Sequence, residues 1–226
     1  MEALLTSLGA FVAFHVVPAI GPLRRFLVGA MGSVMYTVTY SAVSVGLLVW
    51  VGFAYGEAEY VELWPRSEWM IWVPVALMYP ACAFLMGSLK NANPLSVGVR
   101  ADDYDPDRPA IVSITRHPLM WALILWSGAH IVPNGDQASV LMFGLFALYG
   151  AAGPRIIDAK KRRQLGFDAW AKLAGPTSSV PFWAALRGRT KVDWENVACA
   201  PGLGGLVLYA VLMGAHLFVI GVSPLP

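Results

Sequence analysis

Long runs of apolar residues separated by short polar stretches dominate the chain. Six of these runs contain no Asp, Glu, Lys or Arg, and they approach the roughly 20 residues that an α-helix needs to cross a bilayer. They cover residues 4–20, 28–53, 69–87, 118–133, 138–154 and 201–222. The pattern therefore predicts an all-α fold, a polytopic transmembrane helix bundle with about six spans that forms a single domain over residues 1–226.

Local features refine this prediction. Pro74 and Pro80 predict a bend in the third run. The fourth run is short for a span and could extend back over residues 111–115. The first run is not expected to be a cleaved signal peptide, because no basic region precedes it. Residues 156–173 predict a basic helix that mixes four consecutive cations with apolar side chains, a composition that suits the anionic headgroup surface of a membrane.

Composition supports a membrane protein and excludes several other classes. Hydrophobic residues make up 57% and charged residues 13% of the chain, whereas an average soluble protein carries roughly 25% charged residues. The net charge of +2 is too small to indicate a nucleic-acid partner. The two cysteines, Cys82 and Cys199, form neither a disulfide framework nor a C-x-x-C motif. The expected environment of the chain is therefore the lipid bilayer.

The distribution of lysine and arginine predicts the orientation. The loops after the first, third and fifth runs hold two, four and nine of them, whereas the opposite side of the membrane holds Arg66 alone. The positive-inside rule places the richer loops in the cytoplasm. Both chain termini are then expected on the outer side.

Four aspartates cluster in the loop after the third run. They are Asp102, Asp103, Asp105 and Asp107. Their spacing lacks the glycine and the terminal glutamate of an EF-hand calcium loop. We therefore expect a solvated loop rather than a metal site.

All four histidines lie within or at the edge of a predicted span, namely His15, His117, His130 and His216. Ionisable groups inside a membrane are costly and indicate function by default. A structural alternative is that each histidine only forms an interhelical hydrogen bond. Because four of four fall there and the spans hold no Asp, Glu, Lys or Arg, we favour function. Neutral imidazoles on facing helices suit the two axial positions of haem b.

Helix geometry restricts which histidines could share one iron. His117 and His130 are 13 residues apart, which is about 20 Å along a helix axis and excludes a shared iron. Membrane depth pairs His130 with His216. His15 lies about 8 Å nearer the inner half, a gap that helix tilt can close.

Arg116 and His117 precede the fourth span, where Pro118 suits the first turn of a helix. At headgroup level Arg116 could bind a phosphate or a carboxylate, such as a lipid headgroup or a haem propionate. The alternative is that Arg116 is only a membrane anchor whose long side chain reaches the interface.

At these residues the chain resembles the NnrU family of bacterial membrane proteins. The resemblance lies in "FHVV" at residues 14–17, "TRHPLMWALILWSGAHIVPNG" at 115–135, "LGFDAW" with the later "VPF", and the closing "AHLFVIGVSPLP". Zeta-carotene isomerase, a haem-b enzyme, shares this domain. The resemblance implies haem b with His15 and His130 as axial ligands and His216 behind them or in a substrate pocket. It also implies a bacterial inner membrane, so the outer side that the charge distribution predicts for both termini is the periplasm.

Three functions follow from these observations and stay open. The first is a redox-gated cis–trans isomerase that acts on an apolar, carotenoid-like polyene. The second, by family analogy, is a non-enzymatic accessory protein linked to nitrite and nitric oxide reduction, as in denitrification. The third comes from the similarity of Arg116-His117-Pro118 to isoprenylcysteine carboxyl methyltransferases, although the tyrosine and glycine that follow in that family are missing here. The sequence leaves the catalytic residues, the substrate and the oligomeric state open.

Overall fold

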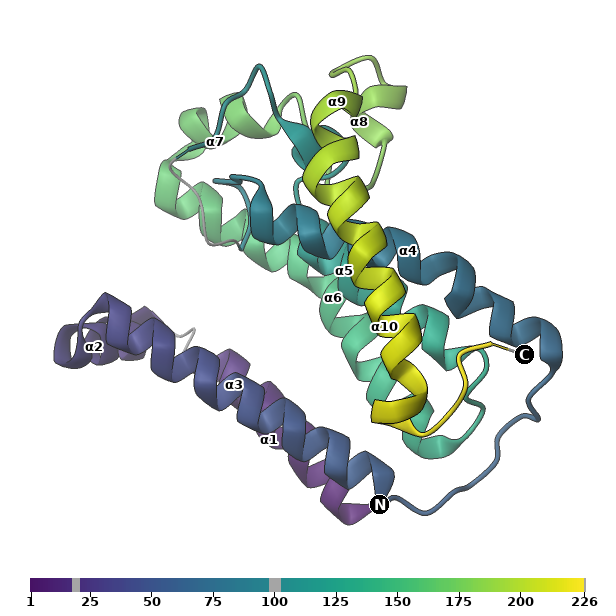
Figure 1. The fold of residues 1–226 in the computed structure, drawn as a ribbon. Coiled ribbons are helices and arrows are strands. Elements are labelled where there is room, and N and C mark those ends of the chain that lie inside the picture. Colours follow the sequence, from purple (N-terminus) through teal and green to yellow (C-terminus); the bar gives the residue numbers. More distant parts are fainter. Residues whose placement is uncertain (18–20, 98–102, 226) are drawn as a thin grey trace. The chain divides into compact units, whose positions relative to one another are not determined.

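The structure, a computed structural model, describes residues 1–17, 21–97 and 103–225 and is 74% helical. Within this part of the chain the only β-type pairing is one isolated bridge between Glu62 and Asp136, so the all-α prediction is confirmed (Figure 1). The elements, in order, are α1 (Glu2–Val16), α2 (Gly21–Met31), α3 (Ser33–Gly56), α4 (Glu68–Lys90), η2 (Ala110–Ser113), α5 (Pro118–Ile131), α6 (Gln137–Leu165), α7 (Phe167–Ala174), α8 (Trp183–Leu186), α9 (Trp194–Val197), η3 (Ala198–Leu203) and α10 (Gly204–Ile220).

Each of the six predicted spans contains a helix, although not every helix is long enough to cross a bilayer. Among the described residues, four helical segments pass by length and composition, namely α3, α4, α6 and the continuous run Trp194–Ile220. The pair α1 and α2 would add a fifth if it forms one span. Helix α5 has 14 residues, which reach only about 21 Å along the axis. The count of about six spans is therefore approximate.

Glycines with positive φ shift several boundaries away from the predicted ones. The run 28–53 does not form one helix, because its first residues belong to α2 and the chain turns at Gly32, whose φ is +79°. The basic helix predicted over 156–173 is two helices, since Gly166 has a φ of +82° and separates α6 from α7. Glycine adopts this conformation without steric cost, and an apolar run does not reveal it. Residues 18–20, at the end of the first predicted span, lie outside the described residues.

Helix α4 stays continuous across Pro74 and Pro80 and packs against α5 and α10. The hydroxyl of Tyr209 on α10 donates a 2.9 Å hydrogen bond to the main-chain oxygen of Val75 on α4. The contact between these helices is also close at Gly205, where an added Cβ would lie 2.6 Å from the Cα of Ala83. A small residue at this position therefore lets the two backbones approach each other.

The chain divides into two compact units. Unit 1 comprises Met1–Trp64 and Gly135–Met142, and unit 2 comprises Pro65–Asn134 and Phe143–Pro226. In unit 1, α1 and α2 each pack against α3. In unit 2, a buried cluster forms around the turn η2 with residues of α4 and α5. That a single domain covers 1–226 stays a prediction.

A buried carboxylate, Asp136, lies in unit 1 between two of the predicted spans. Asp136 is 8% exposed, and its oxygens accept hydrogen bonds from the backbone N–H and the hydroxyl of Ser139 in the first turn of α6. The Ser139 hydroxyl also contacts the Tyr55 hydroxyl at 2.8 Å. Asp136 therefore caps α6 and connects it to α3.

A substitution at Gly135 tests the close contact between the loop before α6 and Trp64. The Gly135 carbonyl oxygen accepts hydrogen bonds from the N–H groups of Leu63 and Trp64, and an added Cβ would overlap the Trp64 carbonyl oxygen and lie 2.6 Å from the Trp64 Cδ1. We expect Gly135→Ala to lower the free energy of unfolding by about 1–3 kcal/mol, the range for overpacking. The thermal midpoint of the detergent-solubilised protein measures this change.

Gly128→Ala is the matched control. Gly128 lies within α5 and no heavy atom would come within 4 Å of its new Cβ. Alanine favours a helix over glycine, so this variant should be neutral or slightly more stable. Equal thermal midpoints for both variants would contradict the close contact at Gly135.

Candidate functional site

A buried segment that includes the short helix η2 leads into α5 and positions its first residues. The whole of η2 is buried, as are Thr115 and His117. Ala110 has a φ of +46°, a left-handed conformation that is rare for a residue with a Cβ. Its N–H donates a 3.0 Å hydrogen bond to Asp193, and the Ile114 oxygen accepts a 2.9 Å hydrogen bond from Phe182 N–H. These bonds hold the segment in one conformation.

Asp193 is the partner of this segment from the chain just before α9. Burial raises the pKa of its carboxyl, but hydrogen bonds from the Ala110 N–H and from Asn196, together with the Arg108 charge, outweigh burial and leave the pKa below its usual range. The ionised carboxylate thus joins the start of η2 to the start of α9.

Arg116, His117 and Asp158 form a hydrogen-bonded ion cluster, here called the Asp158 cluster. Arg116 donates from Nε to Asp158 Oδ1 at 3.0 Å and from Nη2 to Oδ2 at 2.5 Å, which is the bidentate geometry of strong arginine–carboxylate pairs. His117 Nε2 contacts Asp158 Oδ1 at 3.0 Å, and its Nδ1 contacts the Ser96 hydroxyl at 3.2 Å. The cluster therefore connects the start of α5 to the basic end of α6.

Backbone and aromatic contacts surround the cluster. The Arg116 N–H donates to Ser178 O at 2.9 Å, and its own carbonyl oxygen accepts from the Asn93 side chain at 2.9 Å. The Arg116 guanidinium lies over the Trp170 ring of α7, 5.9 Å from its centroid. The end of α4, the start of α5, the end of α6 and α7 are thus held together at one end of unit 2.

The order Ser96, His117, Asp158 resembles a nucleophile, a base and an orienting acid. However, the His117 side chain is fully buried and the Ser96 residue is 3% exposed. The Asp158 charge is also bound by Arg116. A reacting group would have no access to Ser96, so the chemistry of this cluster is positioning rather than nucleophilic catalysis.

Arg116 and His117 were expected to face the membrane surface or a ligand, and the structure gives both an internal partner. The side chains of Arg116 and Asp158 are 12% and 20% exposed, so neither is a free anchor at the headgroups. Sequence reasoning missed this pairing because 42 residues separate the two positions. The available signal was that Asp158 is the only acid between Asp136 and Asp168.

His130 lies in an aromatic environment in unit 2, near the end of α5. Its Nδ1 is 2.7 Å from the carbonyl oxygen of Trp126, and its ring stacks on Phe143 with a centroid distance of 5.3 Å and an interplanar angle of 28°. A carbonyl only accepts hydrogen bonds, so Nδ1 carries the hydrogen and Nε2 of the neutral ring carries the lone pair. This is the tautomer of a histidine that ligates a metal through Nε2.

His216 has the same tautomer, but its Nδ1 bonds to a carbonyl oxygen beyond the end of its helix. Gly221 ends α10 with a φ of +81°, and the chain turns back so that Val222 O lies 2.7 Å from His216 Nδ1. His130 and His216 both belong to unit 2.

His15 lies in unit 1, on α1. Its Nδ1 is 2.8 Å from Phe11 O, and its ring contacts those of Phe11 and Tyr40 at centroid distances of 4.1 and 5.7 Å. Because His15 and His130 belong to different units, their pairing stays a prediction. In the described ranges, no three His, Cys, Asp or Glu side chains are grouped as a metal site, and Asp102 of the aspartate cluster lies outside those ranges.

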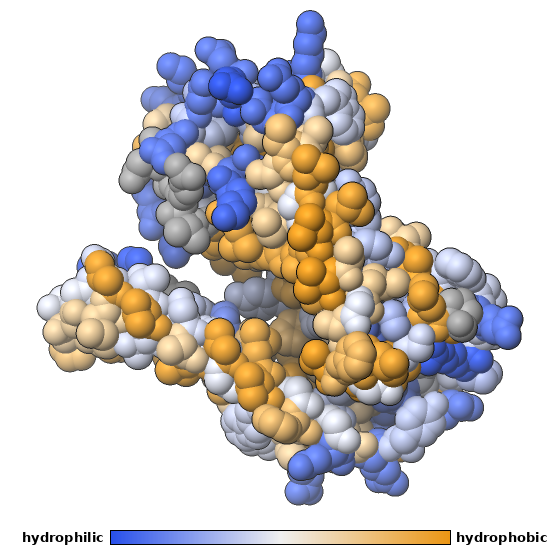
Figure 2. Space-filling model, viewed as in Figure 1, coloured by the Kyte–Doolittle hydropathy of each residue, from blue (hydrophilic) through white to orange (hydrophobic). Residues whose placement is uncertain are grey.

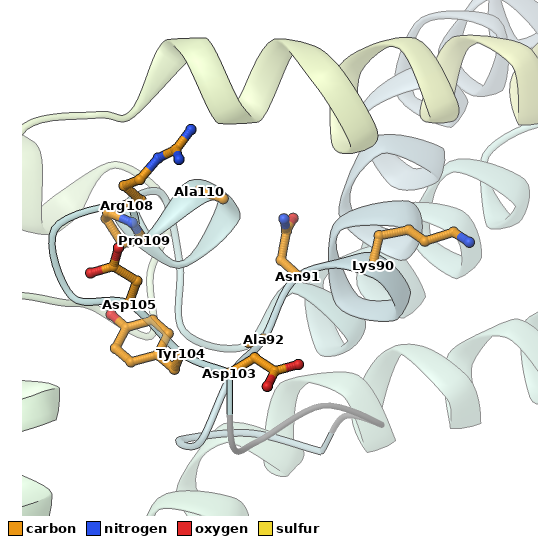
Figure 3. Close-up of a pocket in the computed structure, with 9 residues that line it drawn as sticks. All are labelled: Lys90, Asn91, Ala92, Asp103, Tyr104, Asp105, Arg108, Pro109 and Ala110. Atoms are coloured by element: carbon orange, nitrogen blue, oxygen red, sulfur yellow. The ribbon is translucent and has the colours of Figure 1, made fainter.

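Two of the clustered aspartates line a cavity of about 200 Å³, bounded by residues 90–92, 103–105 and 108–110 (Figure 3). Figure 3 shows the charged ends of Lys90, Asp105 and Arg108 pointing in different directions. Asp105 accepts a hydrogen bond from Asp107 N–H, and Arg108 donates to Asn196. Because these charges do not converge, the cavity is not a plausible site for one charged ligand.

The Asp158 cluster predicts a stability effect. Asp158→Asn removes the charge that Arg116 needs, and we expect the free energy of unfolding to fall by about 2 kcal/mol, less than the roughly 3–5 kcal/mol for a fully buried pair. Asp168→Asn, on an exposed residue of α7, should cost under about 1 kcal/mol. Chemical denaturation in detergent, followed by tryptophan fluorescence, compares the two variants. Equal losses would show that the cluster contributes nothing specific.

Comparison with known proteins gives one match. The family described as NnrU protein matches residues 3–224, nearly the whole chain. No curated protein and no solved structure matches. The match includes all four histidines and the Asp158 cluster. The chain belongs to the NnrU family.

Proposed function

We propose that this NnrU-family protein binds haem b within the membrane, with His130 and His15 as the axial ligands. The observation that carries the proposal is the tautomer of the span histidines. Nδ1 of His15, His130 and His216 lies 2.7–2.8 Å from a main-chain carbonyl oxygen, so Nε2 of each neutral ring holds the lone pair that iron requires. His117 is not assigned to the iron, because its two ring nitrogens contact Ser96 and Asp158.

The surroundings of His130 are aromatic and apolar, which is the chemistry that contact with a haem macrocycle would require. Trp126, Phe143 and Phe146 form a set of ring contacts beside the imidazole, with centroid distances between 5.2 and 5.8 Å. Phe143 stacks on the ring while the Trp126 carbonyl holds Nδ1, so two contacts fix the plane of the imidazole. Residues behind a ligand set its orientation and basicity in this way.

The proposed activity is cis–trans isomerisation of a carotenoid-like polyene. Haem b held by these histidines would supply a Lewis acid for a double bond and a redox centre that could control the activity. The chain's own residues hold each imidazole in one tautomer. The competing function, an accessory protein without turnover in nitrite or nitric oxide reduction, uses the same haem site.

The methyltransferase alternative has less support. In that reading Arg116 and His117 would bind a cofactor near the cytoplasmic face. Here the Arg116 guanidinium pairs with Asp158, and both His117 nitrogens have partners. A cofactor at these groups would have to displace Asp158 or Ser96.

Substitution of the histidines tests haem binding. We expect His130→Ala and His15→Ala each to lower the haem content by at least on the order of tenfold, and to shift the Soret band of the haem that remains bound. Loss of only a hydrogen bond to a metal-ligating residue already lowers affinity by about this factor. His117→Gln should leave the spectrum unchanged. Absorption spectra of protein purified after expression with ample haem give the result.

His216→Ala decides the ligand pair. Because His216 and His130 both belong to unit 2, loss of low-spin haem in His216→Ala but not in His15→Ala would replace His15 by His216 as the second ligand. A parent protein that purifies without a Soret band would end the haem proposal. Isomer analysis of supplied carotenoids then separates the isomerase from the accessory protein.

We further propose a bacterial inner-membrane location with both termini in the periplasm. The Asp158 cluster supports it, because its bonds bring the loop after α4 and the basic end of α6 to the same end of unit 2. These are two of the three loops rich in lysine and arginine. Their common end agrees with the positive-inside rule.

Reporter fusions test the orientation. A fusion after Glu62 should be active only with a reporter that works in the periplasm, and fusions after Asp103 or Arg189 only with one that works in the cytoplasm. The physical reason is that the loops containing Asp103 and Arg189 are rich in lysine and arginine, and such loops stay in the cytoplasm. A cytoplasmic Glu62 would invert the proposed topology.

A further inference from the structure

Large apolar side chains are exposed on the segment between α7 and α10. The exposed fractions of Phe182, Trp183, Leu186 and Trp194 are 41%, 44%, 77% and 62%. The Phe182 and Trp194 rings are neighbours, with a centroid distance of 6.3 Å. An exposed apolar patch within a polar, basic segment indicates that these side chains contact another molecule or a membrane.

The backbone holds these side chains outward. Phe182 has a φ of +61°, and its N–H donates a 2.9 Å hydrogen bond to Ile114 O in the buried segment before α5. Ala184 is fully buried, and its carbonyl oxygen accepts a hydrogen bond from Arg189 N–H at 2.9 Å. Residues two positions apart in a helical turn point to roughly opposite sides. Since Ala184 faces inward, Phe182 and Leu186 face outward.

Chain connectivity places the patch at a membrane boundary. Trp194 is the first residue of the run Trp194–Ile220, which is long and apolar enough to cross a bilayer. Tryptophan at the end of a span favours the headgroup region, where its ring is apolar and its N–H is solvated. Figure 2 shows hydrophilic residues gathered at the end of unit 2 where Figure 1 places α7, α8 and α9, and hydrophobic residues along α10.

The chain before and within most of the patch is basic, and the acidic residues beside it are Asp193 and Glu195, on either side of Trp194. Between Asp168 and Asp193 the chain holds Lys172, Arg187, Arg189 and Lys191 but no acidic residue. The Arg187 guanidinium lies over the Trp183 ring, 4.5 Å from its centroid, so charge and aromatic surface are adjacent. Basic residues beside exposed rings complement an anionic lipid surface.

We propose that residues 182–194 form an interfacial anchor. Phe182, Trp183, Leu186 and Trp194 insert at the boundary of headgroups and acyl chains, in the leaflet where the run Trp194–Ile220 begins. Arg187 and Lys191 contact anionic phospholipid headgroups. This anchor is independent of haem binding and of the basic end of α6, and it fixes the depth of unit 2 in the membrane.

Site-specific fluorescence tests the depth. In a background with Cys82→Ala and Cys199→Ala, Leu186→Cys carries the environment-sensitive dye NBD, and Asp107→Cys on an exposed loop residue is the control. The full chain is placed in vesicles of phosphatidylcholine and phosphatidylglycerol, with bromine on the upper acyl carbons. We expect quenching at residue 186 to exceed that at residue 107 by at least about twofold, because only residue 186 reaches the acyl boundary.

The lipid charge is tested on the same protein. Omitting phosphatidylglycerol should reduce quenching at residue 186, and Arg187→Gln with Lys191→Gln should abolish that dependence, while Arg187→Lys with Lys191→Arg keeps it. Quenching that does not depend on phosphatidylglycerol would overturn the headgroup contact. Absence of quenching, or efficient disulfide formation between two unlabelled Leu186→Cys copies, would overturn the anchor, the latter by showing that a second copy covers the patch.

Discussion

The Asp158 carboxylate accepts hydrogen bonds from Arg116 and His117 at the point where α5 begins, and the arrangement of unit 2 depends on this contact. Helix α5 has 14 residues and gains little stability from its own length. Its first turn is instead fixed by side chains from α6 and by the buried segment before it. That fixed start determines the direction of α5, and so the place of His130 thirteen residues later.

The helical architecture was predictable because membrane spans leave a strong apolar signal. Each of the six apolar runs contains a helix. The boundaries at Gly32 and Gly166 were not predictable, because a glycine in an apolar or basic run does not show whether its φ is positive. The predicted positions of the histidines within or at the edge of spans also agree with the helices, since hydropathy alone assigns them.

The partners of the polar residues were less accessible. Hydrogen bonds between His15 and Phe11 O, and between His130 and Trp126 O, join positions four apart and follow from helix geometry. His216 bonds instead to Val222 O across the turn at Gly221, and His117 bonds to Asp158 41 residues away. Contacts between positions four apart follow from the helical period. Contacts between distant positions depend on how the helices pack, which cannot be read from a single sequence.

The separation of Arg116 and Asp158 has a consequence for biogenesis. During synthesis Arg116 leaves the ribosome first, and its carboxylate partner follows only after the rest of α5 and most of α6. A helix as short as α5 cannot hold a transmembrane position alone in the interval. We therefore expect α5 and α6 to enter the bilayer as one hairpin, because the contact between Arg116 and Asp158 forms only after both helices have been synthesised.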